Sequence, residues 1–356
     1  MSSKSLPIVL ALLAGSPALA QLTLEPYWSI APVNATTFPD SNSLTRGGSF
    51  NPTTGNLLVA SRAGTTGVHI LNGATGIETG TLNMTGITGG TFALNMISVA
   101  ADGAIYGANL VTASSAGSPF KIYRWANEAA APTVVYSGDP GAGRYGDSFS
   151  VRGSGTSTEI IAGQGGSGVA TATRLVHLGT ADGSTFTAAT LNVSGITGGD
   201  LRLGLDFGPG NTVYGKQAGA LRFVSYDLGA ATAALTASFT LTSPNGAIPG
   251  PIGIYGDTLV AYAYNGSESS QIVNVYSISN LLTSGSNSPL DSEVLGSANA
   301  NNNGVGAVDF NADGTIVYVV APNNGVTAYR LIPEPGTWAL LGCGVVLLGW
   351  SIRCRS

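Results

Sequence analysis

The stretch VDFNADGTIVYV, residues 308–319, decides the fold class of this chain. It contains two short apolar segments separated by a tight turn at Asp313 and Gly314. An Asp-Gly pair supplies the positive φ that a tight hairpin turn needs, and the Val, Ile, Phe and Tyr residues on either side favour extended backbone. Residues 308–319 therefore predict an antiparallel β-hairpin.

The same hairpin pattern recurs about every 46–58 residues, and most copies are followed by a further predicted strand. The six copies, of which the third is degenerate, cover residues 49–60, 98–107, 150–161, 206–215, 254–261 and 308–319. Consecutive units of three or four short antiparallel strands are typical of β-propeller blades. We predict an all-β fold, a β-propeller of about six blades. A seventh blade within residues 284–303, or a β-helix or stacked sandwich, is the alternative.

A longer repeat supports this division of the chain. TLNMTGITGG at residues 81–90 returns as TLNVSGITGG at residues 190–199, an offset of 109 residues. A propeller blade takes about 40–50 residues including its loops, so this offset corresponds to two blades.

The two ends of the repeated region predict how the ring closes. The sixth unit has room for about three strands before Leu331, whereas residues 22–30 form a spare predicted strand. If that strand completes the last blade, no open sheet edge remains. Pro26 then suits the outermost position, where a backbone N–H is not needed.

Composition limits the kinds of partner. Charged residues make up 9% of the chain and 51 of its 356 residues are glycine, which suits short strands and turns better than helices. Residues 21–331 carry 11 basic and 18 acidic residues, a net charge of −7. No basic stripe is present, so we predict no nucleic-acid partner.

The N-terminal residues read as a targeting segment. Residues 1–20 contain Lys4, an apolar run over residues 6–14 and the small-x-small triplet of residues 18–20. This pattern is typical of a secretory signal peptide that is read by the secretion translocon and cleaved before Gln21. We therefore predict an exported domain at residues 21–331.

The C-terminal residues 332–356 combine a proline–acid–proline element, an apolar run and two arginines. In order, these are Pro333, Glu334, Pro335, residues 336–352, Arg353 and Arg355. Proline cannot continue a helix, the apolar run predicts a single transmembrane helix, and the arginines favour the cytoplasmic side. At about 1.5 Å per residue the helix reaches roughly 25 Å, slightly short of a bilayer core of about 30 Å.

This tail resembles the PEP-CTERM sorting tail of surface proteins of Gram-negative bacteria. The resemblance implies processing by an exosortase-type enzyme, with inner-membrane anchoring during sorting and then delivery to the cell surface or extracellular matrix. It also implies an association with exopolysaccharide and biofilm. An ordinary C-terminal membrane anchor preceded by a proline-containing linker is the alternative.

Aligning the six hairpins brings polar side chains to the starts of successive innermost strands, where propellers bind ligands. The candidate ligand-binding residues are Arg46, Asn95, Arg144, Asp147 and Arg202. Charged hydrogen bonds from such a mouth suit an anionic or hydroxyl-rich ligand, with polysaccharide as the candidate. The alternative is that these residues cap strands, pair with one another or face solvent.

We predict no catalytic residue, metal or cofactor. The two cysteines, Cys343 and Cys354, both lie in the tail, so residues 21–331 can form no disulfide or cysteine–zinc site. The only histidines, His69 and His177, occupy equivalent places in different blades, with no recurring acid beside both, and we expect them on strand surfaces. Paired carboxylates could cleave glycosides, because several Asp and Glu residues are present and their pairing is spatial, but no pattern in the sequence selects two of them.

The leading functional hypothesis is an exported, non-catalytic propeller that binds or builds the cell surface or its matrix. The body also resembles uncharacterised bacterial propellers that carry an Arg-Gly before an Asn-Pro hairpin, here Arg46-Gly47 and Asn51-Pro52. One alternative is a carbohydrate-active enzyme, a lyase or hydrolase, with its site at the channel mouth. A purely structural coat protein is a third hypothesis, and it predicts no saturable glycan binding.

Overall fold

The computed structural model describes residues 22–165, 173–216, 220–267, 271–297 and 299–333. The predicted signal peptide, residues 1–20, lies outside the described residues, as do Glu334, Pro335, Arg353 and Arg355 of the predicted sorting tail. Pro333 is described and is the last residue of strand β24. Within the described ranges, no helix has the length and apolar character needed to cross a bilayer.

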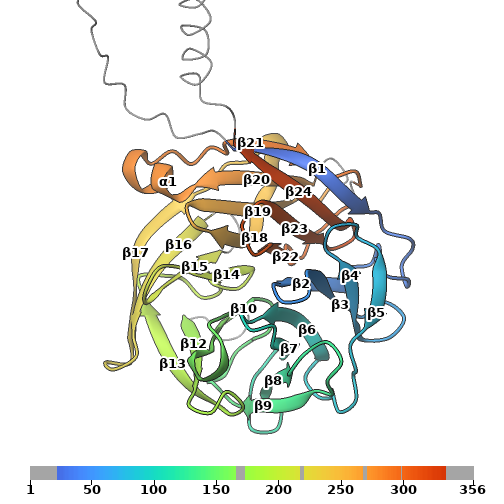
Figure 1. Ribbon diagram of the computed structural model, residues 1–356. Helices are drawn as coiled ribbons and strands as arrows, with labels where there is room; N and C mark the ends of the chain where they lie inside the picture. Colours follow the sequence, from blue (N-terminus) through green and yellow to red (C-terminus); the bar gives the residue numbers. More distant parts are fainter. Residues whose placement is uncertain (1–21, 166–172, 217–219, 268–270, 298, 334–356) are drawn as a thin grey trace, which may run out of the picture. The chain divides into compact units, whose positions relative to one another are not determined.

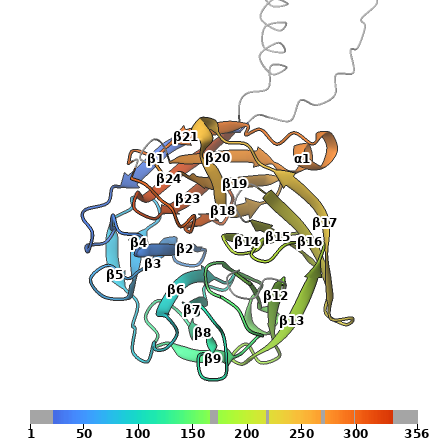
Figure 2. The ribbon, with the colours of Figure 1, turned by 180° about the vertical axis from the view of Figure 1, so that it is seen from behind.

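Residues Thr23–Ile332 form one compact unit built from strands. The strands of the described residues group into six four-stranded units that are arranged in a ring, as a propeller arranges its blades (Figures 1 and 2). Each of the six hairpins expected from the sequence forms the first two strands of one unit, which confirms the all-β, propeller-like prediction.

The strand bounds are as follows. The first unit consists of β2 (Thr45–Asn51), β3 (Asn56–Ser61), β4 (Gly67–Asn72) and β5 (Glu78–Thr81). The second consists of β6 (Phe92–Val99), β7 (Ile105–Leu110), β8 (Phe120–Trp125) and β9 (Thr133–Gly138). The third consists of β10 (Phe149–Arg152), β11 (Glu159–Gly163), β12 (Arg174–Thr180) and β13 (Phe186–Ser194).

The remaining units follow the same plan. The fourth consists of β14 (Gly204–Phe207), β15 (Thr212–Lys216), β16 (Ala220–Asp227) and β17 (Thr232–Thr240). The fifth consists of β18 (Ile248–Tyr255), β19 (Thr258–Tyr264), β20 (Ile272–Ser277) and β21 (Asp291–Val294). The sixth consists of β22 (Ala307–Phe310), β23 (Ile316–Ala321), β24 (Gly325–Pro333) and β1 (Leu22–Ile30).

Short helical turns occur in three connections. They are η1 (Gly155–Ser157), η2 (Pro244–Gly246) and α1 (Ile278–Ser284). The N-cap of helix α1 is Ser277, whose side chain accepts a hydrogen bond from the Asn280 N–H, and its C-cap is Gly285 in the left-handed conformation. The Asn-rich region 284–303 supplies β21 of the fifth unit and connecting segments, so its described residues form no seventh blade.

Ring closure follows the sequence expectation. Strand β1 pairs with β24 in the order β1-β24-β23-β22, so the N-terminal strand is the outermost strand of the sixth unit and Pro26 lies on its edge. Trp28 of β1 reaches the first unit, where its Nε1 donates to the Gly73 carbonyl over 2.9 Å. The last unit is thus assembled from both ends of the described chain.

The innermost strands β2, β6, β10, β14, β18 and β22 line a central channel. Each contacts the next, and β22 contacts β2, which completes the circle. Glycine allows the closest approach: a Cβ at Gly47 would lie 2.8 Å from the backbone of Met96 and Ile97 on β6. The apolar core is divided among clusters that lie largely between neighbouring units, such as the one that packs Leu58 and Val68 against Trp125.

The 109-residue repeat occupies equivalent places two units apart. Residues 81–90 run from the end of β5 toward β6, and residues 190–199 run from the end of β13 toward β14. The third and fourth units differ from the others in one respect. Within the second copy of the repeat, residues 192–194 of β13 pair in parallel with β17. This pairing joins the third and fourth units into one eight-stranded sheet.

Candidate functional site

One mouth of the channel collects charged residues from the first, third and fourth units of the ring. Arg46 is the second residue of β2, Asp147 lies two residues before β10, and Arg202 lies two residues before β14. Innermost strands run in the same direction along a propeller channel, so their first residues meet at the same mouth. The side chains that the sequence analysis selected are therefore brought together by the ring.

Asp147 is the centre of this group. Its carboxylate is 2% exposed and accepts hydrogen bonds from Nε and Nη2 of Arg144, the latter over 2.9 Å. Arg202 donates a third bond from Nε to Oδ2 over 2.8 Å. Burial acts to raise the pKa of Asp147, but the bonds and charges of the two arginines outweigh it and hold that pKa below its ordinary value.

Arg46 lies close enough to this group to respond to its charges. Burial lowers the pKa of Arg46, Asp147 raises it, and the positive charges of Arg144 and Arg202 lower it again, with a net lowering. The side chain is 8% exposed, and its Nε donates to the Ser43 carbonyl over 2.8 Å.

A fourth arginine, Arg62, was missed by the sequence analysis. It follows β3, whose last residue Ser61 pairs with Thr45 of β2, so Arg62 lies beside Arg46. Its Nη2 donates to the Ser43 carbonyl over 3.3 Å, and its guanidinium carbon lies 3.4 Å from the centre of the Phe92 ring. Extending the register of the 49–60 hairpin back to the start of β2 would have located this residue.

The environment of Arg62 is electrostatically unfavourable. Burial lowers its pKa to about 10, and the neighbouring charge of Arg46 contributes to the same shift. Its Nε is buried without a hydrogen-bond partner among the described residues. A buried donor without an acceptor costs free energy, about 1–3 kcal/mol for a typical group.

Asn95 stabilises the backbone next to Asp147 at the mouth. Its side chain is buried, and its Nδ2 donates to the Gly146 carbonyl over 2.7 Å, directly before Asp147. Its Oδ1 is buried without a partner in the described part of the chain. Asn95 is therefore placed to position Asp147, although the sequence analysis grouped it with the ligand-binding residues.

The acids near the mouth neutralise only part of its charge. Besides Asp147, the carboxylate whose charge reaches both Arg46 and Arg62 is Asp40. The oxygens of Asp40 accept bonds from the backbone N–H groups of residues 42, 44 and 45 and from the Thr45 hydroxyl. Among the described residues of the mouth, four arginines face two carboxylates, which is an excess of two positive charges.

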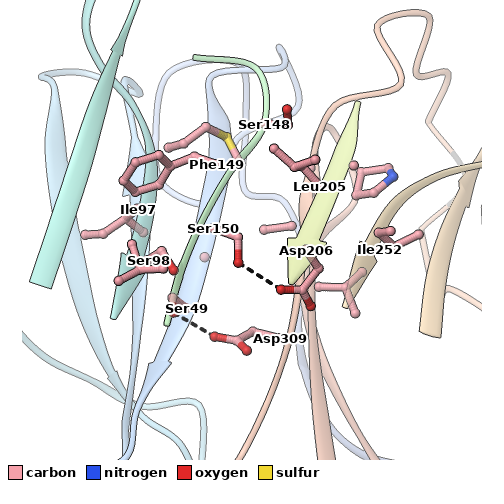
Figure 3. Close-up of a pocket in the computed structure, with 18 of the residues that line it drawn as sticks. Ser49, Ile97, Ser98, Ser148, Phe149, Ser150, Leu205, Asp206, Ile252 and Asp309 are labelled. Atoms are coloured by element: carbon pink, nitrogen blue, oxygen red, sulfur yellow. Dashed lines mark hydrogen bonds between the residues drawn. The ribbon is translucent and has the colours of Figure 1, made fainter. Parts of the chain in front are cut away.

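Below the mouth, the channel contains a cavity of about 220 Å³ lined by residues from all six innermost strands (Figure 3). Serine hydroxyls and two carboxylates give it its polar character. These residues are Ser49, Ser98, Ser148, Ser150, Asp206 and Asp309.

The two carboxylates are both held by three hydrogen bonds. Asp206 accepts from the Ser150 hydroxyl and from the backbone N–H groups of Phe207 and Ile254, at 2.8–2.9 Å. Asp309 accepts from the Ser49 hydroxyl over 2.6 Å and from the N–H groups of residues 50 and 310, both over 2.8 Å. In Figure 3 both carboxylates project toward the same part of the channel.

Enclosure in the channel changes the acidity of both groups. Burial raises the pKa of Asp206 to about 7, and the nearby negative charge of Asp309 adds to the shift. Burial raises the pKa of Asp309 as well. The tertiary structure thus selects a carboxylate pair that no sequence pattern identified.

The structure corrects the expectation that both histidines lie on strand surfaces. Each has a carboxylate partner: His69 Nδ1 lies 2.8 Å from Glu78, and His177 Nε2 lies 3.2 Å from Glu159. His177 is also buried rather than on a strand surface, and burial lowers its pKa. No group of three or more His, Cys, Asp or Glu side chains suited to a metal ion occurs within the described ranges.

Comparisons with known proteins bear on the fold. Residues 28–159 match the family described as a domain of unknown function (DUF4623). The chain is similar in structure to a crystallised DUF4623 family protein from Bacteroides eggerthii, with 18% identity and a TM-score of 0.57 over 83% of this chain and 72% of the other.

A second similar structure is XC5397 from Xanthomonas campestris, a gluconolactonase, with 12% identity and a TM-score of 0.51 over 87% of this chain and 97% of the other. A comparison with curated proteins gives no match. At these identities the structural likenesses establish the fold alone. Residues 28–159 are thus similar to an uncharacterised family, and the described chain has a propeller-like fold.

Proposed function

We propose that this protein is an exported, non-catalytic propeller of the cell surface or its matrix that binds exopolysaccharide at the channel mouth. The observation that carries the proposal is the convergence of four arginines from three units on one mouth of a channel in an otherwise acidic protein. Guanidinium groups recognise anionic and hydroxyl-rich ligands through charged hydrogen bonds.

The interior of the channel supports binding rather than catalysis. Asp206 and Asp309 each use their oxygens to accept three hydrogen bonds from the channel wall. A general acid or nucleophile needs a free approach to the reacting atom, which these contacts restrict. The mouth, in contrast, has charged donors that are not all used.

The termini supply the proposed location. Export through the secretion translocon follows from residues 1–20. Residues 336–352 would then anchor the chain in the inner membrane, with Arg353 and Arg355 on the cytoplasmic side. An exosortase-type enzyme would next recognise the element formed by Pro333, Glu334 and Pro335. The mature protein would then reach the surface or the biofilm matrix.

Two experiments test the proposal. A glycan array probed with the full chain in detergent should give saturable binding to polysaccharide fragments, and binding should weaken in Arg202→Ala. Absence of binding to every glycan would overturn the binding function.

In cells, Glu334→Ala should leave the protein in the membrane fraction, whereas unchanged release would contradict sorting through this element.

A carbohydrate-active enzyme is the second candidate, because Asp206 and Asp309 share a polar cavity and the pKa of Asp206 is raised to about 7. The similar Xanthomonas structure is named as a gluconolactonase. Turnover of polysaccharides or sugar lactones that is lost in Asp206→Asn, with Asp147→Asn as the mouth variant for comparison, would favour this candidate over a binding module.

A further inference from the structure

Resting on the proposed binding function, we infer that the mouth holds a seat for the carboxylate of an acidic sugar, with Arg62 as the contact residue and Arg46 as the supporting charge. In this assignment Arg144, Asp147 and Arg202 form the frame that positions the seat. The ligand class is a uronate-containing saccharide.

The arginines differ in how their donors are used. Arg144 and Arg202 direct three N–H groups at Asp147. Arg46 and Arg62 have no carboxylate within hydrogen-bond distance among the described residues and share one acceptor, the Ser43 carbonyl. Each guanidinium carries five N–H donors, so this half of the mouth retains donors for a ligand.

The charge balance favours an anion at the same half. Two guanidinium groups lie close together there, and the oxygens of the nearest acid, Asp40, are already bonded to backbone N–H groups and the Thr45 hydroxyl. The pKa of Arg62 is lowered by burial and by the positive charge of Arg46, and the pKa of Arg46 is lowered by burial and by the positive charges of Arg144 and Arg202. A bound anion would reduce the repulsion among these positive charges.

The shape of the seat favours a carboxylate. Contact with the Phe92 ring fixes the plane of the Arg62 guanidinium, which then presents its N–H groups in a fixed fork. The frame beside it already binds one carboxylate, Asp147, through the Nε and Nη2 of Arg144. Planar forks of this kind match carboxylates bidentately.

The cavity below the seat favours a sugar over a simple carboxylic acid. It has a volume of about 220 Å³, and its lining includes serine hydroxyls and the carboxylates of Asp206 and Asp309 among apolar residues. A sugar ring offers several hydroxyl groups as further hydrogen-bond partners for these polar atoms, whereas an apolar acid offers none there.

The experiment measures binding of trigalacturonate to the full chain in detergent by calorimetry, beside its methyl-esterified form, which has the same rings without the charges. We expect the acidic trimer to bind about tenfold more tightly, since only its carboxylates can form charged hydrogen bonds with the arginines. Arg62→Ala should lose about tenfold in affinity for the acidic trimer only. Arg62→Lys should lose less, because it keeps the charge without the fork.

Arg330→Ala is the matched control, because Arg330 is an exposed arginine that lies 4.1 Å from the Tyr27 ring centre, outside the mouth. It should bind like the wild type, and melting curves verify that each variant is folded.

Equal affinity for the acidic and esterified trimers, or unchanged affinity in both Arg62 variants, would overturn the carboxylate seat and leave the proposed glycan binding standing. Tighter binding of sulfated or phosphorylated trisaccharides than of trigalacturonate would also overturn it. Absence of binding to any glycan would overturn both proposals.

Discussion

The mouth and the interior of the channel are built on the same innermost strands but carry opposite charges. Asp206 lies only four residues beyond Arg202 along the chain, and Asp309 faces Ser49, three residues beyond Arg46. The interior carboxylates have their hydrogen bonds satisfied by the channel wall, whereas Arg46 and Arg62 at the mouth share a single carbonyl.

This difference separates structural from ligand-directed charges. Asp206 on β14 accepts from Ser150 on β10 and from the Ile254 N–H on β18, so it ties three consecutive innermost strands together. Asp309 on β22 similarly ties the sixth unit to the first through Ser49 and Phe50. Hydrogen bonds that join neighbouring units contribute to stability, while a charged group with unused donors is available for binding.

The largest expected effect tests the closed ring on which both regions depend. Deleting residues 22–30 removes the outermost strand of the sixth unit, the buried Leu24 and the bond from Trp28 to Gly73. We expect destabilisation of at least about 5 kcal/mol or failure to fold, measured by urea denaturation, since a whole sheet edge is exposed. Pro26→Ala, on the outer edge, should change stability by less than about 0.5 kcal/mol. A negligible effect of the deletion would contradict closure by β1.

Asp309→Ala tests the interior next. It leaves the Ser49 hydroxyl and two backbone N–H groups without an acceptor, so the free energy of unfolding should fall by about 3 kcal/mol. Asp313→Ala, at the exposed hairpin turn, is the matched control and should cost much less. Equal losses in the two variants would remove the structural role assigned to the interior acids.

The pH dependence of stability sharpens the same distinction. The pKa of Asp206 is raised from 3.8 to about 7 in the folded protein, so the folded state binds its proton more tightly than the unfolded state. Its contribution is therefore largest below about pH 4 and is lost as the pH rises through about 7. Urea midpoints should fall between pH 5 and pH 7.5, and this fall should be smaller in Asp206→Asn. A slope of the opposite sign in the wild type would contradict the assignment.

The smallest expected effect concerns the mouth. Arg62→Ala removes one long hydrogen bond and the contact with Phe92, but it also relieves repulsion with Arg46. We expect the free energy of unfolding to change by no more than about 1 kcal/mol, measured by urea denaturation beside Asp309→Ala. If the two variants are equally destabilised, the mouth is as structural as the interior and the comparison fails.

Much of the fold was predictable because its signals are local. The six hairpins were located by short apolar segments and turn glycines such as Gly55 and Gly314, which adopt positive φ in the structure. The 109-residue repeat correctly gave a spacing of two units, and the spare strand at residues 22–30 correctly gave the closing partner of β24. Aligning the hairpins also brought Arg46, Asp147 and Arg202 to one mouth.

The rest of the site depended on contacts between distant residues. Arg62 was missed because it follows a second strand, and only the pairing of β3 with β2 places it beside Arg46. Asn95 proved to hold Gly146, and His177 proved to be buried beside Glu159, because their neighbours come from other strands. The Asp206–Asp309 pair was invisible in the sequence, since the two residues lie 103 positions apart.

The amino-acid sequence by itself determined the strand and turn pattern, because apolar segments and turn glycines act over a few residues. The repeat spacing and the spare strand at residues 22–30 then gave the repeating unit and the closure of the ring. The tertiary structure alone decided which charges meet and which hydrogen bonds they satisfy. Six strands around a common channel bring together side chains that are far apart in the chain, and burial there sets their pKa values and their unused donors.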